Sequence, residues 1–249
     1  MLYLIGLGLA WKDLSLKALE AINKSDKIYL ECYTSISDFS VLKLERLLGK
    51  KIQVLSRKEV EETQPFFKEA HLKDIALLVY GDPLTATTHT ELILSAKKKK
   101  IKIEVIHAPS IFTAVAQSGL FLYKFGKTAS IPIPEKGFRP ESFFDILEQN
   151  QRAGAHTLFL LDLKPEEKKY LTIRDAIKIL LQISKKRKSK FLNEGTLCVG
   201  CARLGQKAQI IKVAEAKQLM NASFGPPPYC LIVPSKLHFM EEEVLKKLK

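Results

Sequence analysis

The chain has 249 residues, of which 46% are hydrophobic and 27% charged, enough for one large packed domain or two ordinary ones. No apolar run reaches the ~18 residues that a membrane-spanning helix needs, and the start lacks the features of a signal peptide. The formal net charge of +13 could attract nucleic acid or an acidic protein. Aromatic residues do not interleave with the lysine runs, so we expect a function that requires no nucleic acid. The scattered cysteines fit a reduced, cytoplasmic setting.

The four cysteines, Cys32, Cys198, Cys201 and Cys230, lie among apolar neighbours. Cys198 and Cys201 have the spacing of a metal-binding pair, but no second pair and no histidine cluster accompanies them. Both also lie in a strand-like run, where positions three apart face opposite sides. We therefore favour reduced, structural cysteines over a metal or redox site, and we expect no metal.

The first half of the chain alternates strand-like and helical patterns. Residues 1–7 form an apolar strand-like run, and a Gly-x-Gly turn leads into a helix that Asp13 or Ser15 can cap. Trp11 stands where a dinucleotide-binding fingerprint would have its third glycine, so that kind of site is not expected. Further strands are predicted at 27–30, 52–55, 75–80 and 103–106, and helices at 39–48, partly over 57–70, at 89–98 and at 111–119. This alternation predicts a mostly parallel sheet.

The segment at residues 81–89 follows a buried strand-like run. Gly and Pro stop the strand, and Thr87 or Thr88 can cap the next helix, with Glu91 completing a capping box after Thr88. Asp82 then lies at the carboxyl end of a strand, the edge where open α/β sheets bind ligands. An ordinary turn or capping role for Asp82 explains the same residues.

Ser110 occupies a second informative loop, between a predicted strand and a predicted helix. Its hydroxyl is well placed to cap that helix. Alternatively, the hydroxyl and nearby backbone groups face a ligand at the same sheet edge as Leu9 and Asp82. Both interpretations stay open from the sequence.

Beyond this helix the pattern changes to consecutive strands with few helices. Strands are predicted at 128–133, 157–161, 196–202, 209–213 and 229–233, and helices at 140–149 and 172–184. Thr172 can cap the second of these helices, with Asp175 at its third position. We therefore predict an α/β fold of two domains, residues 1–112 with a mostly parallel sheet and residues 113–249 with a mixed sheet. The cleft between them is the expected ligand site.

Several short motifs occur in a fixed order from residue 1 to about residue 245. They are residues 4–9, 81–83, 86–89, 107–111, 123–126, 156–158, 196–200, 202–205 and 237–238. Together they resemble the diphthine synthase family, diphthamide-biosynthesis methyltransferases with the tetrapyrrole-methylase (class III methyltransferase) fold. Gly-Asp-Pro at 81–83 is shared by the wider fold, whereas the motifs at 86–89 and 123–126 are more specific to this family.

The resemblance implies a homodimeric enzyme that binds folded S-adenosyl-L-methionine between its two domains. It implies translation elongation factor 2 as the protein substrate, whose modified histidine carries a 3-amino-3-carboxypropyl group. Repeated methylation of that amino group gives diphthine. No metal is implied, and we name no catalytic base, because a neutral amine aligned behind an activated methyl group needs none.

The family's cofactor positions fall on eight residues of this chain: Leu9, Asp82, Thr85, Ser110, Ile111, Leu161, Leu204 and Tyr229. The residue type at position 85 varies among relatives, and Tyr229 stands where relatives often have His. Its ring could pack on the adenine, or its hydroxyl could bond to it. His89 and His107 lie near these loops, where capping or packing is the favoured role.

Two other functions remain open from the sequence. One is a methyltransferase of the same fold that acts on a tetrapyrrole or on ribosomal RNA. The other is a non-enzymatic RNA-binding protein, which the net charge of +13 suggests. Binding of S-adenosyl-L-homocysteine would distinguish a methyltransferase from a non-enzymatic RNA-binding protein.

Overall fold

The computed structural model describes residues 1–37, 40–135, 137 and 139–248, so the predicted helix start at Phe39 lies outside the described residues. The chain divides into two compact units. The first comprises Met1–Ala114 and Gly205–Lys207, and the second comprises Val115–Leu204 and Ala208–Lys249. The boundary expected at residue 112 and the cleft expected between the domains stay predictions.

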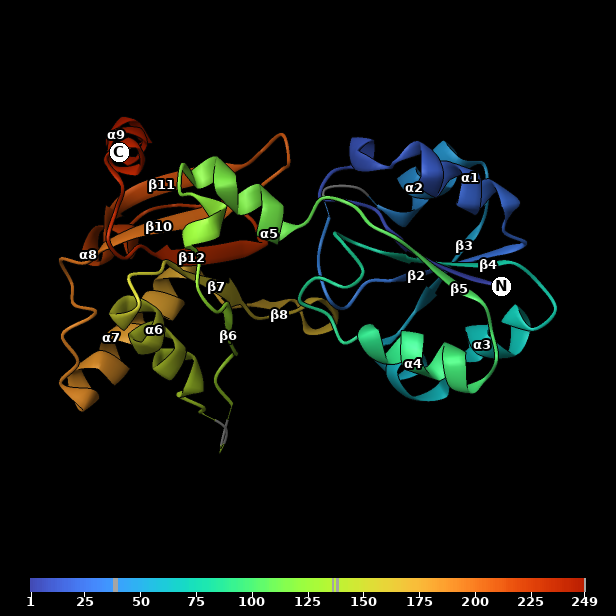
Figure 1. Ribbon diagram of the computed structural model, residues 1–249, viewed down its shortest axis with the longest axis horizontal. Helices are drawn as coiled ribbons and strands as arrows, with labels where there is room; N and C mark the ends of the chain where they lie inside the picture. The colour runs from blue at the N-terminus through green and yellow to red at the C-terminus, as the bar shows by residue number, and fades with distance from the viewer. Residues whose placement is uncertain (38–39, 136, 138, 249) are drawn as a thin grey trace. The chain divides into compact units, whose positions relative to one another are not determined.

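The first unit is built on a five-stranded sheet in the order β3-β2-β4-β1-β5, whose strand pairs are parallel (Figure 1). The strands are β1 (Leu2–Gly6), β2 (Lys27–Glu31), β3 (Ile52–Leu55), β4 (Ile75–Val79) and β5 (Ile103–Ile106). The central strands β1 and β4 are buried along their whole length. Near-continuous aliphatic runs suit a sheet that is covered on both faces. The predicted α/β class and mostly parallel sheet are confirmed.

Helices cover both faces of this sheet, with α1 (Leu16–Lys24) and α2 (Val41–Leu48) on one and α3 (Pro65–Ala70) and α4 (Thr90–Lys98) on the other (Figure 1). Short helical turns η1 (Trp11–Asp13) and η2 (Glu59–Thr63) precede α1 and α3. Neighbouring strand residues serve opposite faces, so Ile5 packs in a core with Ile22 while Leu4 packs in another with Phe66. Ser15 accepts a hydrogen bond from the Ala18 amide and caps α1, as predicted.

Helix α4 begins later than the sequence pattern predicts. Its N-cap residue is His89, and neither Thr87 nor Thr88 caps it. The Thr87 hydroxyl donates to the Pro83 carbonyl at 2.6 Å, and the Thr88 hydroxyl donates to Glu61 at 3.3 Å. The predicted capping box at Thr88 is therefore wrong, because both hydroxyls bind groups that lie outside the helix.

The second unit is built on a mixed sheet in the order β11-β10-β12-β7-β6. Its strands are β6 (Ala129–Ile131), β7 (Thr157–Leu161), β10 (Leu197–Ala202), β11 (Ile210–Glu215) and β12 (Tyr229–Val233). The pairs β10–β11, β10–β12 and β12–β7 are antiparallel, and β6 pairs with β7 in parallel. A short hairpin of β8 (Leu163–Lys164) and β9 (Lys169–Tyr170) follows β7. The predicted mixed sheet is confirmed.

The remaining helical elements are α5 (Ile111–Ala114), η3 (Val115–Ser118), η4 (Leu122–Lys124), α6 (Ser142–Arg152), η5 (Pro165–Glu167), α7 (Ile173–Arg187), α8 (Ala216–Leu219) and α9 (Phe239–Leu248). The helix expected over 111–119 is thus a single α-turn that continues as a 3-10 turn. Helices α6 and α7 bury Phe144 and Ile177 in a core that contains Phe159. The Thr172 hydroxyl accepts from the Asp175 amide at 3.1 Å, which confirms the predicted cap of α7.

The cysteines have the surroundings of structural residues. Cys198, Cys201 and Cys230 are buried and free, and Cys32 is partly buried. Burial raises the pKa of Cys198 to about 12, which keeps this thiol protonated and unreactive. Across the part of the chain that the structure describes, no group of three or more His, Cys, Asp or Glu could hold a metal ion. No helix there is long and apolar enough to cross a membrane.

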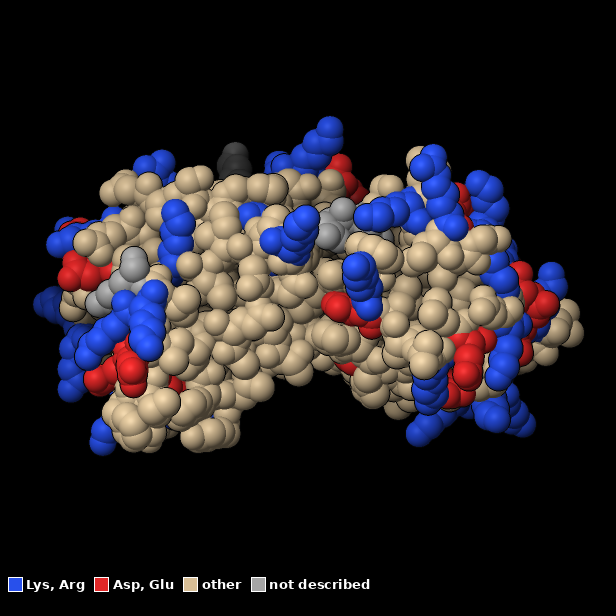
Figure 2. All heavy atoms as spheres, turned by 90° about the horizontal axis from the view of Figure 1, so that it is seen from above, with Lys and Arg blue, Asp and Glu red and all other residues tan. Residues whose placement is uncertain are grey.

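Basic side chains are spread widely over the surface. On the face shown in Figure 2, Lys and Arg occur with Asp and Glu among them. Some of them form exposed ion pairs, such as Lys17 with Glu104, 2.8 Å apart. Such exposed pairs contribute little to stability.

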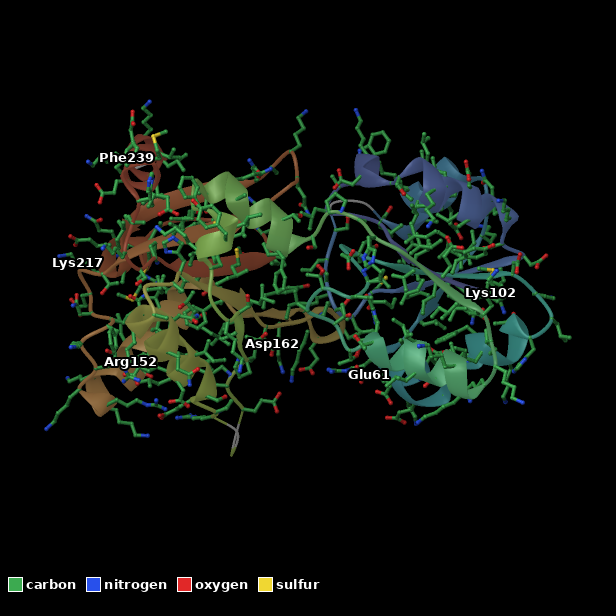
Figure 3. The ribbon with its side chains drawn as sticks, in the orientation of Figure 1. Glu61, Lys102, Arg152, Asp162, Lys217 and Phe239 are labelled. Atoms are coloured by element: carbon green, nitrogen blue, oxygen red, sulfur yellow. The ribbon has the colours of Figure 1, made fainter. Side chains whose placement is uncertain are left out.

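A buried carboxylate, Glu241, ties helix α9 to the rest of the second unit. Its Oε1 accepts hydrogen bonds from the Phe121 amide at 2.8 Å and from His156 Nε2 at 3.0 Å. Its Oε2 accepts from the His238 amide at 2.8 Å and from the Lys124 ammonium group. Glu241 and His156 are both fully buried. Figure 3 labels Phe239, the first residue of α9, which lies two residues before Glu241 in the sequence.

Hydrogen bonds fix the ionisation states in this network. The Ser235 amide donates to His156 Nδ1 at 3.0 Å, so the ring carries its proton on Nε2 and donates it to Glu241. Burial lowers the pKa of His156, and the bond to Glu241 offsets this only in part. Burial by itself raises the pKa of Glu241, but the donated hydrogen bonds outweigh burial and set the pKa to about 2.

The change Glu241→Ala should lower the free energy of unfolding by about 3–5 kcal/mol at pH 7, because it leaves buried donors unpaired. The matched change Glu243→Ala, on the same helix, removes an exposed carboxylate 3.7 Å from Lys247. It should change the free energy of unfolding by less than about 1 kcal/mol. Urea unfolding of both variants measures the difference. Equal stability of the two variants at pH 7 would contradict a stabilising role for this network.

The same network predicts a pH dependence. The pKa of Glu241 lies at about 2, below the ordinary value of 4.5, so its ionisation stabilises the fold fully above pH 4.5. That contribution is lost as the pH falls from 4.5 towards 2. The stability difference between wild type and Glu241→Ala should therefore shrink across this window.

Candidate functional site

Three loops of the first unit meet at the carboxyl edge of its sheet, an edge that we call the rim. Because the strands are parallel, the loops after β1, β4 and β5 all leave at this edge. Gly8 and Gly81 pair there through two backbone hydrogen bonds, of 3.2 Å and 2.8 Å. Leu9 and Asp82 directly follow these glycines, so the rim brings the two residues together.

The end of β1 is closely covered by its neighbours. A Cβ atom at Gly6 would come within 2.7 Å of the Gly81 carbonyl, 2.8 Å of the Ala108 Cβ and 3.0 Å of the Pro83 Cδ. No side chain fits at position 6 unless the backbone moves. The absence of a side chain at Gly6 therefore lets the loops after β4 and β5 approach each other over the end of β1.

Asp82 joins these two loops through its carboxylate. Oδ1 accepts from the Leu84 amide at 2.9 Å and the Thr85 hydroxyl at 3.2 Å, which lie in its own loop. Oδ2 accepts from the Ala108 amide at 3.2 Å and lies 2.7 Å from His107 Nδ1, both in the loop after β5. The side chain is almost completely buried. Asp82 therefore does more than end a turn, because it holds two loops in register.

The hydrogen bonds to Asp82 also decide its charge. Burial by itself raises the pKa of this carboxyl, but the Leu84 amide and His107 act in the opposite direction. Together with the Ala108 amide they outweigh burial, so the pKa of Asp82 lies below its ordinary value and the group is ionised at neutral pH. The rim therefore carries a fixed negative charge.

Ser110 and Ile111 lie farther along the loop after β5. The Ser110 hydroxyl accepts from the Phe112 amide at 3.3 Å, which supports the capping interpretation. Ser110 is buried, whereas Ile111 is partly exposed. Thr85, Ser110 and Ile111 thus share the rim with Leu9 and Asp82, and the structure brings these five predicted residues to one edge.

The three predicted residues of the second unit lie at one end of its sheet. Leu161 ends β7 and Tyr229 begins β12, and the pairing of Cys230 with Leu160 places these two ends side by side. Tyr229 also pairs with Ala202, the last residue of β10, and Leu204 follows two residues later. Asp162, labelled in Figure 3, marks the same end of β7. How this group lies with respect to the rim stays a prediction.

Burial and hydrogen bonding limit which atoms of Leu161, Leu204 and Tyr229 a ligand could contact. The side chains of Leu161 and Leu204 are each 5% exposed, and Leu161 belongs to the hydrophobic core of the second unit. The Tyr229 hydroxyl donates to the Gly225 carbonyl, so its hydrogen is already used within its own loop. The hydroxyl is therefore left only as an acceptor, and both contacts considered for Tyr229 stay predictions.

Arg203 organises the loop before Tyr229, a role that the sequence pattern did not indicate. Its Nε donates to the Ala208 carbonyl at 2.9 Å, and its Nη1 donates to the carbonyls of Phe224, at 2.9 Å, and Pro226. The guanidinium is buried and has no carboxylate partner among the described residues. Arg203 therefore holds this loop by donating to backbone carbonyls as far as 23 residues away in the sequence.

His89 and His107, the two histidines near the rim, differ sharply in exposure. His89 is 1% exposed, its Nδ1 lies 3.1 Å from the Pro83 carbonyl, and burial lowers its pKa. The favoured packing role fits this residue. The His107 side chain is 67% exposed and hydrogen-bonded only to Asp82 among the described residues, so packing does not explain it.

The similarities to known proteins extend over the whole chain. Residues 1–220 match the family model of tetrapyrrole (corrin/porphyrin) methylases. A diphthine synthase from Methanocaldococcus jannaschii is 45% identical over 253 residues, which cover 100% of this chain and 98% of that protein. A diphthine synthase from Methanococcus vannielii is 43% identical at the same coverage.

A solved structure agrees with these sequence matches. A crystal structure of diphthine synthase superimposes with a TM-score of 0.90 at 35% identity, covering 100% of this chain and 96% of the other. Sequence and fold thus agree along the full length. The chain belongs to the diphthine synthase family, S-adenosyl-L-methionine-dependent methyltransferases of diphthamide biosynthesis with the tetrapyrrole-methylase fold.

Proposed function

We propose that this chain repeatedly methylates the amino group of the 3-amino-3-carboxypropyl-histidine of translation elongation factor 2, giving diphthine and S-adenosyl-L-homocysteine. The full-length similarity to diphthine synthases supports this substrate. The observation that carries the proposal is the Asp82 network, which builds a charged rim from the loops after β4 and β5. We further propose that the enzyme acts as a cytoplasmic homodimer.

The residues at the rim suit S-adenosyl-L-methionine in charge and border open space. A Cβ atom at Gly81 would meet nothing within 4 Å, so the backbone there borders open space, in contrast to the closed position at Gly6. The ionised Asp82 suits a cofactor that carries positive charge on its sulfur and its amino group. We propose that the cofactor is held by Leu9, Asp82, Thr85, Ser110, Ile111, Leu161, Leu204 and Tyr229.

The chemistry divides between the cofactor and the chain. When bound, S-adenosyl-L-methionine would supply an activated methyl group on a positive sulfur. The chain has to align the substrate amine, which is proximity catalysis. A protonated amine has no free electron pair, so a proton must leave it before each transfer.

The change Asp82→Ala should weaken binding of S-adenosyl-L-homocysteine about 10- to 100-fold, because it removes a charged acceptor and loosens two loops at once. The matched change Asp74→Ala, just before β4 at the opposite end of the same strand, removes an exposed carboxylate 3.3 Å from the N-terminal amine and should leave affinity unchanged. Isothermal titration calorimetry measures both. Unaltered affinity in Asp82→Ala would remove this residue from the cofactor site.

Incubation with S-adenosyl-L-methionine should add methyl groups to elongation factor 2 that carries the precursor histidine. Mass spectrometry of the histidine peptide should show stepwise addition of methyl groups and count them. Elongation factor 2 with an unmodified histidine is the control and should gain none, since it lacks the amine. Methylation of a tetrapyrrole or of ribosomal RNA, with none on the histidine peptide, would overturn the proposed substrate.

A further inference from the structure

His107 combines an exposed imidazole with a fixed proton position. Its Nδ1 lies 2.7 Å from the Asp82 carboxylate, and 67% of its side chain is exposed. Because an ionised carboxylate only accepts hydrogen bonds, Nδ1 carries the ring proton and donates it. In the neutral ring the free electron pair then lies on Nε2, which makes no hydrogen bond to the described residues. An imidazole held in this way is arranged to accept a proton.

We propose that His107 is the proton acceptor that deprotonates the substrate ammonium group before each methyl transfer. The inference rests on the proposed function, because it assigns a catalytic residue to that same reaction. In the step, a nitrogen–hydrogen bond of the ammonium group breaks and its electron pair stays on the nitrogen. The proton binds to Nε2 of His107 and then passes to solvent, to which the exposed ring has access.

Asp82 supplies what such an acceptor requires. It is the one carboxylate among the described residues with an oxygen within 4 Å of a His107 ring nitrogen. The carboxylate holds the tautomer and stabilises the imidazolium that forms. Because the Leu84 and Ala108 amides also bind this carboxylate, its position does not depend on His107.

The other four histidines lack this combination. His89 and His156 are 1% and 0% exposed, so neither meets a substrate in the described conformation. His71 caps the end of α3, just before the amino end of β4, which is the sheet edge opposite the rim. His238 belongs to the second unit, where its ring contacts that of Phe239 in a tilted arrangement with centroids 4.3 Å apart. The rim therefore presents one accessible imidazole among the described residues.

The decisive experiment compares the pH dependence of methyl transfer to elongation factor 2 in wild type, His107→Ala and His71→Ala. General bases typically contribute 10²–10⁴-fold, so His107→Ala should be about 100-fold slower near pH 7. Its rate should rise continuously with pH and approach that of wild type, because the amine then loses its proton to solvent unaided. Wild type and His71→Ala should share one profile, less steep than that of His107→Ala because the ring accepts the proton.

Three further measurements separate a proton acceptor from a structural role. Calorimetry should show unchanged affinity of His107→Ala for S-adenosyl-L-homocysteine. Added imidazole should restore part of its activity, because the missing ring was exposed. Nitrogen-15 spectra of the free enzyme, assigned by the loss of one histidine signal in His107→Ala, should show the proton on Nδ1 of His107.

The outcomes are distinguishable. A His107→Ala rate that equals wild type, or that is lowered by the same factor at every pH, overturns the assignment of His107 while the proposed function stands. A ring proton on Nε2 overturns it as well. Failure of wild type to methylate elongation factor 2 overturns the proposed function, and this inference with it.

Discussion

The site depends on one constraint, the close approach of two loops over the end of strand β1. Gly6 permits this approach because a side chain there would overlap the Gly81 carbonyl and Ala108. Asp82 then secures it, since its two carboxylate oxygens bind amides on both loops. The parallel order β4-β1-β5 delivers the loops to one edge, but only the missing side chain and the bridging carboxylate bring them within hydrogen-bonding distance. Every proposal about the rim follows from this junction.

Both units use the same physical device, a buried carboxylate saturated by donors. Burial raises the pKa of Asp82 and of Glu241, and hydrogen bonds from backbone amides and a histidine more than offset it in each. The difference lies in the histidine. His156 is fully buried and uses both ring nitrogens, so its pair with Glu241 is structural. His107 uses one nitrogen and is largely exposed, so an equivalent pair is open to a substrate.

Local patterns in the sequence predicted most of the fold, because aliphatic runs and cap residues such as Ser15 and Thr172 report on short-range interactions. The cap at Thr88 was wrong for the opposite reason: its hydroxyl binds Glu61, 27 residues away. The sequence pattern does not predict helix α9. Its buried residue Glu241 is held by a hydrogen bond to His156, which lies 85 residues away in the sequence. For the site, motifs identified the loops, but no spacing rule reveals that Asp82 and His107 meet, or that Arg203 binds carbonyls of a later loop.

The nature of the reaction explains why the motifs indicated a cofactor site and yet no catalytic residue. The activated methyl group makes the transfer itself undemanding, so the chain has to supply alignment and a route for protons. Alignment needs backbone geometry, which glycines and prolines reveal in a sequence. A proton route needs one accessible nitrogen with a defined tautomer, which depends on a partner 25 residues distant. The tertiary contact between Asp82 and His107 therefore carries the chemical information that the sequence motifs lack.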